Sequence, residues 1–174
     1  MQTKRFSPVA LASILSGTLL SLMCGCVGDA VGRYGVVLSN ERNPRQSVQV
    51  DVVAVNDTEY GQWRSYSMTD YWRPDDRLRR DAADYRRTFR FGLHQSAVQE
   101  LKIEDAVWQK WESMGARHLF ILADLGAFED KMGENDPRRL ILPLERRRWD
   151  DETIRIRVDS SGIRCLTPPN PEDD

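Results

Sequence analysis

The sequence predicts a mainly β protein, a β-sandwich that carries one or two short helices. Three observations lead to this fold class. Short apolar runs rich in β-branched residues recur along the chain, turn-forming residues separate them, and strands do not alternate with long helices. The chain has 174 residues, of which 40% are hydrophobic and 30% are charged. That composition is sufficient for one domain with one packed core.

Eight segments show a strand pattern. Residues 48–55 alternate strictly at first and then become continuously apolar, which is typical of a half-buried strand that becomes fully buried. Residues 119–123 are a continuous apolar run of the length of a central strand. The last two segments flank the turn Asp159-Ser160-Ser161-Gly162 and predict a hairpin. The segments are residues 34–38, 48–55, 88–94, 98–103, 119–123, 140–144, 154–158 and 163–165.

Two segments favour short helices. Ser67, with Asp70 three residues later, forms a variant capping box, so a helix is expected over residues 68–72 and should end before Pro74. Residues 105–114 have one apolar face with two tryptophans and a glycine directly after them, which also predicts a helix.

The segments between these elements are polar or aromatic. Residues 75–85 are expected to be a solvated connection with helical tendency, and residues 124–138 a solvated acidic loop. An aromatic stretch, residues 57–73, precedes them. Its large side chains form either an interaction surface or a lid that packs over one end of the sandwich. They are Tyr60, Trp63, Tyr66 and Trp72.

The N-terminus has the pattern of a lipoprotein signal. Lys4 and Arg5 precede an uncharged, largely apolar stretch over residues 6–28. Within it, Leu22-Met23-Cys24-Gly25-Cys26 resembles a bacterial lipobox, in which the cysteine after a small residue is acylated and becomes the new N-terminus. The alternative is an uncleaved transmembrane anchor, which requires about 20 apolar residues and is disfavoured by Pro8, Gly17 and four serines within residues 6–24.

This pattern divides the chain into four parts. Residues 1–25 are expected to be a lipoprotein signal peptide, 26–33 a tether, 34–166 the β-sandwich domain and 167–174 a disordered tail. Cys26 is then the lipidated residue, with palmitate among its acyl chains. Because Val27 stands where an inner-membrane retention signal has Asp, we expect the periplasmic face of the outer membrane.

Charge and composition argue against several function classes. Without residues 1–25, the chain has 23 basic and 27 acidic groups, a balance that argues against nucleic-acid binding. His94 and His118 have no partner at metal-ligand spacing, and the phosphate-binding and nucleophile motifs are missing from the sequence. We therefore expect no catalytic residues, no metal and no cofactor, and rank an envelope enzyme lowest.

Arginine supplies 21 of the 25 basic residues, and nine of them lie on or beside predicted strands. They form either a patch that binds an anionic glycan or lipid headgroup, with Arg155 and Arg157 as the expected anion-binding residues, or an outer sheet face whose charges pair with neighbouring acids. The nine are Arg86, Arg87, Arg90, Arg146, Arg147, Arg148, Arg155, Arg157 and Arg164.

The order of the segments resembles the TssJ family, the outer-membrane lipoproteins of the type VI secretion system. The lipobox is followed by a short strand, a loop with Asn43-Pro44, the alternating strand over 48–55, an aromatic helical stretch and the apolar run 116–123. The helix over 105–114 and the loop 124–138 look like additions to that pattern.

The resemblance implies a transthyretin-like β-sandwich and a structural function. Members of this family tether the secretion membrane complex to the outer membrane by binding the periplasmic domain of the inner-membrane protein TssM. The loop between the first two strands makes that contact in the family. In this chain the loop is 39–47, which makes Arg42, Asn43, Pro44 and Arg45 the expected partner-binding residues.

Overall fold

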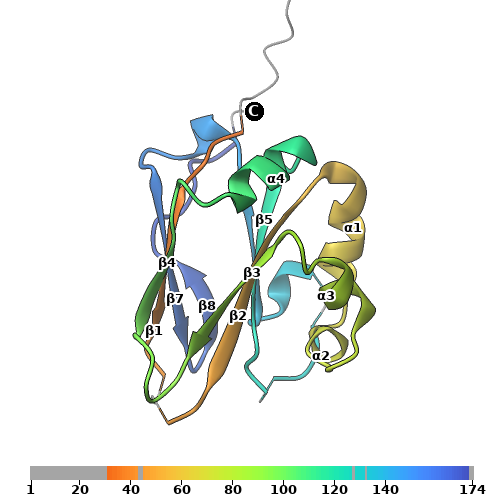
Figure 1. Cartoon of the computed structure of the whole chain (residues 1–174), viewed down its shortest axis with the longest axis vertical. Coiled ribbons are helices and arrows are strands. Elements are labelled where there is room, and N and C mark those ends of the chain that lie inside the picture. The colour runs from red at the N-terminus through yellow and green to blue at the C-terminus, as the bar shows by residue number, and fades with distance from the viewer. Residues whose placement is uncertain (1–30, 43–44, 127, 132, 173–174) are drawn as a thin grey trace, which may run out of the picture.

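The computed structural model describes residues 31–42, 45–126, 128–131 and 133–172. The predicted signal peptide, Cys26, Asn43 and Pro44 lie outside these residues. Eight strands make two four-stranded sheets that face each other (Figure 1). The strands are β1 (Gly35–Asn40), β2 (Val48–Val55), β3 (Arg86–Phe91), β4 (Val98–Leu101), β5 (His118–Ala123), β6 (Arg139–Pro143), β7 (Thr153–Asp159) and β8 (Gly162–Cys165). The predicted mainly β, two-sheet architecture is confirmed.

The first sheet has the order β4-β1-β7-β8. β1 pairs antiparallel with β4 and parallel with β7, and the parallel pair was not predicted. β7 and β8 form the predicted hairpin. Gly162 has a φ of +128°, and a Cβ there would lie 2.4 Å from the carbonyl oxygen of Pro137, so only glycine fits this turn.

The second sheet has the order β3-β2-β5-β6, with β2 and β5 at its centre. One face of these two strands packs in the core between the sheets, where Val50 and Ile121 are fully buried. The other face is covered by helices, and Val53 and Phe120 are fully buried there. Burial on both faces explains why the two segments read as nearly continuous apolar runs.

The described residues contain four α-helices rather than the one or two expected. They are α1 (Asp57–Ser65), α2 (Met68–Tyr71), α3 (Arg77–Asp81) and α4 (Val107–Ser113), and the short 3₁₀ turns η1 (Gly133–Asn135) and η2 (Arg146–Arg148) accompany them. α2 begins at the predicted cap, where the Ser67 side chain accepts a hydrogen bond from the N–H of Asp70 at 3.0 Å. α4 ends before Gly115, which has a φ of +66°.

Helices α1, α2 and α3 form a layer over the outer face of β2 and β5 (Figure 1). Trp63 is buried in this layer, and Tyr60, Tyr66 and Trp72 are half-buried against it. The aromatic stretch is therefore a lid, as one of the two interpretations held, but it covers a sheet face rather than an end of the sandwich.

Loop 124–138 is anchored more firmly than a solvated loop. Asp136 and Arg138 are buried, and the Arg138 Nη2 donates to Asp136 Oδ2 at 2.8 Å. Asp130 accepts hydrogen bonds from Ser67 Oγ at 2.6 Å and from the N–H of Thr69 at 2.9 Å. The loop thus holds the start of α2.

The described chain begins and ends at the same end of the sandwich, near η2 (Figure 1). The N–H of Gly32 donates to the carbonyl oxygen of Leu144 at 2.8 Å, just before η2. Residues 167–172, expected to belong to a disordered tail, contact the same region, because the N–H of Asn170 donates to the carbonyl oxygen of Arg148 at 2.7 Å. Within the described ranges, no helix has the length and apolar character needed to cross a membrane.

Candidate functional site

The β1–β2 loop lies at the opposite end of β1 from the start of the described chain (Figure 1). The N–H of Asn40 donates to the carbonyl oxygen of Ala97, and the N–H of Glu41 donates to that of Val158, which ties the loop to both neighbouring strands. Arg42 is half-buried and donates from Nη2 to Gln46 Oε1 at 3.2 Å, whereas Arg45 is exposed. The start of the loop is therefore held by backbone hydrogen bonds, and the described residues after it present polar side chains.

Two of the exposed large hydrophobic residues lie beside this loop. Leu93 is 64% exposed and Val98 is 54% exposed. Val98 is paired with Ser39 of β1, and Leu93 lies in the turn between β3 and β4. The sequence pattern predicted a strand over residues 88–94, but β3 ends at Phe91, and the hydrogen bond from the N–H of Gln95 to the carbonyl oxygen of Gly92 turns the chain out of the sheet before Leu93 can pair.

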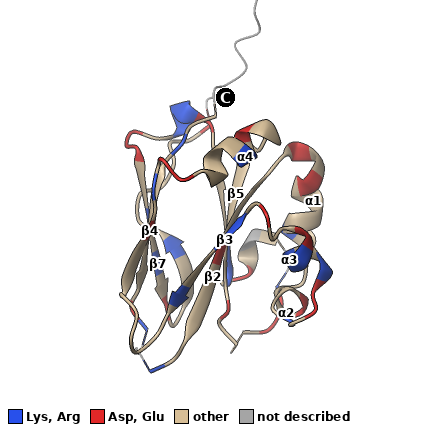
Figure 2. Cartoon of the chain, viewed as in Figure 1, with Lys and Arg blue, Asp and Glu red and all other residues tan. Residues whose placement is uncertain are grey.

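The nine arginines near strands do not gather on one face (Figure 2). They belong to both sheets and to η2. Several are paired with acids: Arg86 with Asp51 at 2.5 Å, Arg87 with Asp105 at 2.9 Å, Arg146 with Glu152 at 2.9 Å and Arg157 with Asp159 at 3.4 Å. These contacts favour the interpretation in which the arginine charges pair with neighbouring acids over a single basic patch, although the arginines are spread over both sheets and η2 rather than over one outer sheet face.

Arg155 and Arg157 point outward from β7, on the sheet face that the helices leave uncovered. Arg157 also reaches Glu41 of the β1–β2 loop, with 3.7 Å between Nη1 and Oε2. In the described part of the chain, the guanidinium of Arg155 makes no hydrogen bond or ion pair and is exposed. The two residues are therefore neighbours with different surroundings.

A buried cluster around Asp51 was missed by sequence reasoning, which put this residue on the polar side of an alternating strand. Asp51 is fully buried beneath α2 and α3. Its carboxylate accepts hydrogen bonds from four side chains: Tyr71 at 3.0 Å, Arg79 at 2.8 Å, Arg86 at 2.5 Å and Thr88 at 2.6 Å. The cluster holds the helical layer against the sheet.

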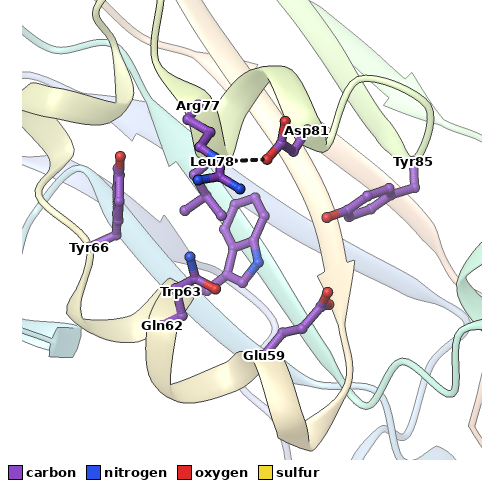
Figure 3. A pocket seen from close by; sticks show the side chains of 8 residues that line it. All are labelled: Glu59, Gln62, Trp63, Tyr66, Arg77, Leu78, Asp81 and Tyr85. Carbon is purple, nitrogen blue, oxygen red and sulfur yellow. Dashed lines mark hydrogen bonds and ion pairs between the residues drawn. The ribbon is translucent and has the colours of Figure 1, made fainter.

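A pocket of about 370 Å³ opens in the helical layer between α1 and α3 (Figure 3). Its walls combine aromatic and acidic side chains from segments that are not adjacent in the sequence, so no local pattern predicted it. Residues that line it include Glu59, Gln62, Trp63, Tyr66, Asp81 and Tyr85.

Within the described residues, no three His, Cys, Asp or Glu side chains come together as metal ligands would. His118 lies 2.8 Å from Asp57 Oδ1 and stacks against Tyr60, with 4.3 Å between ring centroids, so it supports the start of α1. Cys165 is a half-buried free cysteine.

Family models and curated proteins give no match to this chain. Solved structures do. The chain is similar to Serratia marcescens Lip, a membrane-bound component of the type VI secretion system, at 14% identity and a TM-score of 0.45, over 83% of this chain and 100% of that one. It is similar to the lipoprotein TssJ1 of Pseudomonas aeruginosa at 14% identity and a TM-score of 0.41, over 81% and 99%.

A further similarity is to a chain of a type VI membrane complex, at 13% identity and a TM-score of 0.49, over 79% of this chain and 99% of that one. TssJ1 bears the name of the family that the segment order resembles. The similarity is distant, at 14% identity or less in each of these structures.

Proposed function

We propose that this protein is an outer-membrane lipoprotein that acts as a structural tether: acyl chains on Cys26 hold it in the membrane, and its β1–β2 loop binds the periplasmic domain of a TssM-like inner-membrane protein of a secretion complex. The lipobox supports the anchor. Several acyl chains are needed for lasting attachment, because one chain alone binds a membrane only marginally.

The observation that carries the proposal is the separation of the two ends of the sandwich. Five residues lead from Cys26 to Val31, and an extended chain spans at most about 3.5 Å per residue, so the body begins within about 18 Å of an acylated Cys26. β1 then runs away from that end for six residues, or about 20 Å, before the loop begins. A membrane anchor at Cys26 leaves the loop on the far side of the body, open to a partner.

The chemistry of the far end also suits a protein partner. Arg42 and Arg45 offer guanidinium groups that bind carboxylates, and arginine is enriched among residues that dominate binding energy. Leu93 and Val98 add the apolar contact area that the loop lacks. Asn43 and Pro44 complete the proposed contact.

The anchor is tested by replacing the lipidated residue. In cells that are fed a labelled fatty acid, the wild-type protein should take up the label and fractionate with the outer membrane. The Cys26→Ser variant should lose both properties. Label retained in this variant would refute the anchor.

The partner contact is tested by capture from cells. We expect the Arg42→Glu/Arg45→Glu variant to recover at least about tenfold less of the periplasmic partner, since two charge reversals oppose a carboxylate-bearing surface. Arg146→Glu, an exposed reversal at the membrane end, is the matched control and should leave recovery unchanged. If the two variants recover equal amounts of the partner, the β1–β2 loop does not make the contact.

A second candidate function rests on the exposed guanidinium of Arg155. Together with Arg157 it provides an outward pair on the uncovered sheet that suits an anionic glycan or lipid headgroup. Such binding should weaken with added salt and with Arg155→Gln/Arg157→Gln. Binding that is unchanged by added salt and by the two substitutions would exclude this alternative.

A further inference from the structure

The pocket between α1 and α3 has a pattern of side chains that the tether function does not use. Trp63 forms its floor, and Figure 3 shows Glu59 on one side of the indole and the Arg77–Asp81 pair on the other. Tyr85 points its hydroxyl toward the same space. Because a water molecule occupies about 30 Å³ in the liquid, a volume of about 370 Å³ is large enough for a side-chain-sized ligand.

The acceptors in this pocket lack sufficient donors. Glu59 Oε2 is buried and accepts no hydrogen bond from the described residues. A buried carboxylate oxygen without a donor is costly, and such atoms in native proteins usually have a partner. Asp81 accepts a hydrogen bond from Arg77 Nε at 3.3 Å, but the Arg77 side chain is 85% exposed, so this pair is held weakly.

The surroundings favour positive charge in the same space. Burial raises the pKa of Tyr85, and the negative charges of Glu59 and Asp81 raise it further. The half-buried ring of Tyr85 offers aromatic surface, which attracts cations. Arg77 already brings one guanidinium to the rim.

We propose that this pocket is a binding site for a guanidinium or ammonium group, with Glu59 and Asp81 as its acceptors and Trp63 as its floor. The group belongs either to an arginine or lysine side chain of another protein or to a small cationic molecule. Arg77 competes with the ligand for Asp81. This site is independent of the β1–β2 loop, so failure of the tether proposal leaves it intact.

The test uses the mature, acylated protein in detergent micelles with ¹⁵N-labelled tryptophan. The indole signal of Trp63 is identified by its loss in Trp63→Phe. We expect N-acetyl-arginine amide to shift this signal in a saturable manner and to leave the other indole signals in place. N-acetyl-glutamate amide should have no effect. An unmoved Trp63 signal with both blocked arginine and blocked lysine would overturn the proposal.

Variants of the pocket define the acceptors. Glu59→Gln keeps the shape of the side chain and should raise the dissociation constant about tenfold, while Asp81→Asn, at a more exposed position, should raise it about threefold. Arg77→Ala should lower it, because the competing guanidinium is gone. Asp75→Asn removes an exposed charge that does not line the pocket and should change nothing. Equal affinity in Glu59→Gln and wild type would refute the site, and unchanged signals of the other indoles show that each variant is folded.

A crosslinking arm distinguishes the two sources of the cation. A photo-reactive residue in place of Gln62, at the pocket rim, should give a protein adduct in cells if the cation is a partner's side chain. If the cation is a small molecule, no protein adduct should form. The low-molecular-mass fraction of a cell extract should then shift the Trp63 signal. Failure of both arms would contradict the proposal.

Discussion

The two outer faces of the sandwich differ in what covers them and in where their charged side chains point. The face of β3-β2-β5-β6 is covered by α1, α2 and α3, and its charges are turned inward, with Asp51 at the centre of a buried cluster. The face of β4-β1-β7-β8 has no helix over it among the described residues (Figure 1). Its charges, including Arg155 and Arg157, point to solvent.

The difference shows that charged residues have different effects on the two sheets. Around Asp51 they fix the position of a layer, because a buried carboxylate is tolerated only when its hydrogen bonds are satisfied. On the uncovered sheet they are screened by water and contribute little to stability, which leaves them free for binding.

The largest effect is expected from Asp51→Ala. This change leaves Arg79 and Arg86 partly buried without a counter-charge, and breaking such a cluster typically costs about 3–5 kcal/mol of unfolding free energy. Asp159→Ala, on β7 of the other sheet, should cost less than about 1 kcal/mol. Urea unfolding of both variants checks the contrast, and similar midpoints would contradict it.

A comparable loss is expected from Phe120→Ala, on the helix-covered face of β5. Phe120 is fully buried against Trp63, with 5.9 Å between ring centroids, and truncation of a buried phenylalanine costs about 3–5 kcal/mol. Val37→Ala, on the uncovered face of β1, should cost less than about 1 kcal/mol. Thermal unfolding measures both, and equal losses would mean that the helices add little cover.

Low pH should reduce the stability of the helix-covered side before that of the uncovered sheet. Burial alone raises the pKa of Asp136, but hydrogen bonds from Arg138 and from the N–H of Lys131 outweigh it and hold this pKa below its ordinary value. A lowered pKa in the folded state means that the stabilisation is present above about pH 4, the unfolded value, and is lost as pH falls through the folded value.

The melting temperature should therefore fall between pH 6 and pH 3. Asp136→Asn should melt lower than wild type at pH 6 but depend less on pH across this range. A variant with the same pH profile as wild type would show that another group controls acid stability.

A smaller effect is expected at the cap of α2. Ser67 accepts from the N–H of Asp70 and donates to Asp130, so Ser67→Ala should cost about 1–2 kcal/mol. Ser65→Ala, an exposed hydroxyl at the end of α1, is the matched control and should stay within about 0.5 kcal/mol. Chemical unfolding distinguishes the two.

The smallest effect is expected from Arg155→Gln/Arg157→Gln. On the uncovered sheet these changes should alter the unfolding free energy by less than about 0.5 kcal/mol. A loss above about 2 kcal/mol would show that this face depends on its charges as the other face does.

Strand positions were largely predictable because they follow from local patterns. Val48–Val55 carries both the alternation of an exposed start and the apolar run of a buried end, and β2 has these bounds. α4 followed from the spacing of Val107, Trp108 and Trp111, which are all buried. Such signals lie within the element itself.

What was missed depends on distant parts of the chain. The partners of Asp51 come 20 to 37 residues later, so its burial leaves no local pattern. The parallel pairing of β1 with β7 likewise joins Val36 with Ile154. α1 did carry a usable signal, since Asn56 caps it and Glu59 follows three residues later.

The candidate site was only partly predictable for the same reason. Arg42 and Arg45 were chosen from a resemblance, while the apolar neighbours Leu93 and Val98 join the loop only through folding. The pocket at Glu59 and Asp81 requires α1 to pack beside α3, which no local pattern predicts.

We propose that a lipid anchor at one end of the sandwich leaves the other end to hold a partner. The most direct test is photo-crosslinking of the acylated protein in cells, with the reactive residue in place of either Arg45 of the β1–β2 loop or Arg147 of η2. The loop and η2 lie at opposite ends of the sandwich (Figure 1). We predict a protein adduct of defined mass from position 45 and none of that mass from position 147. The same adduct from position 147 alone would contradict the claim.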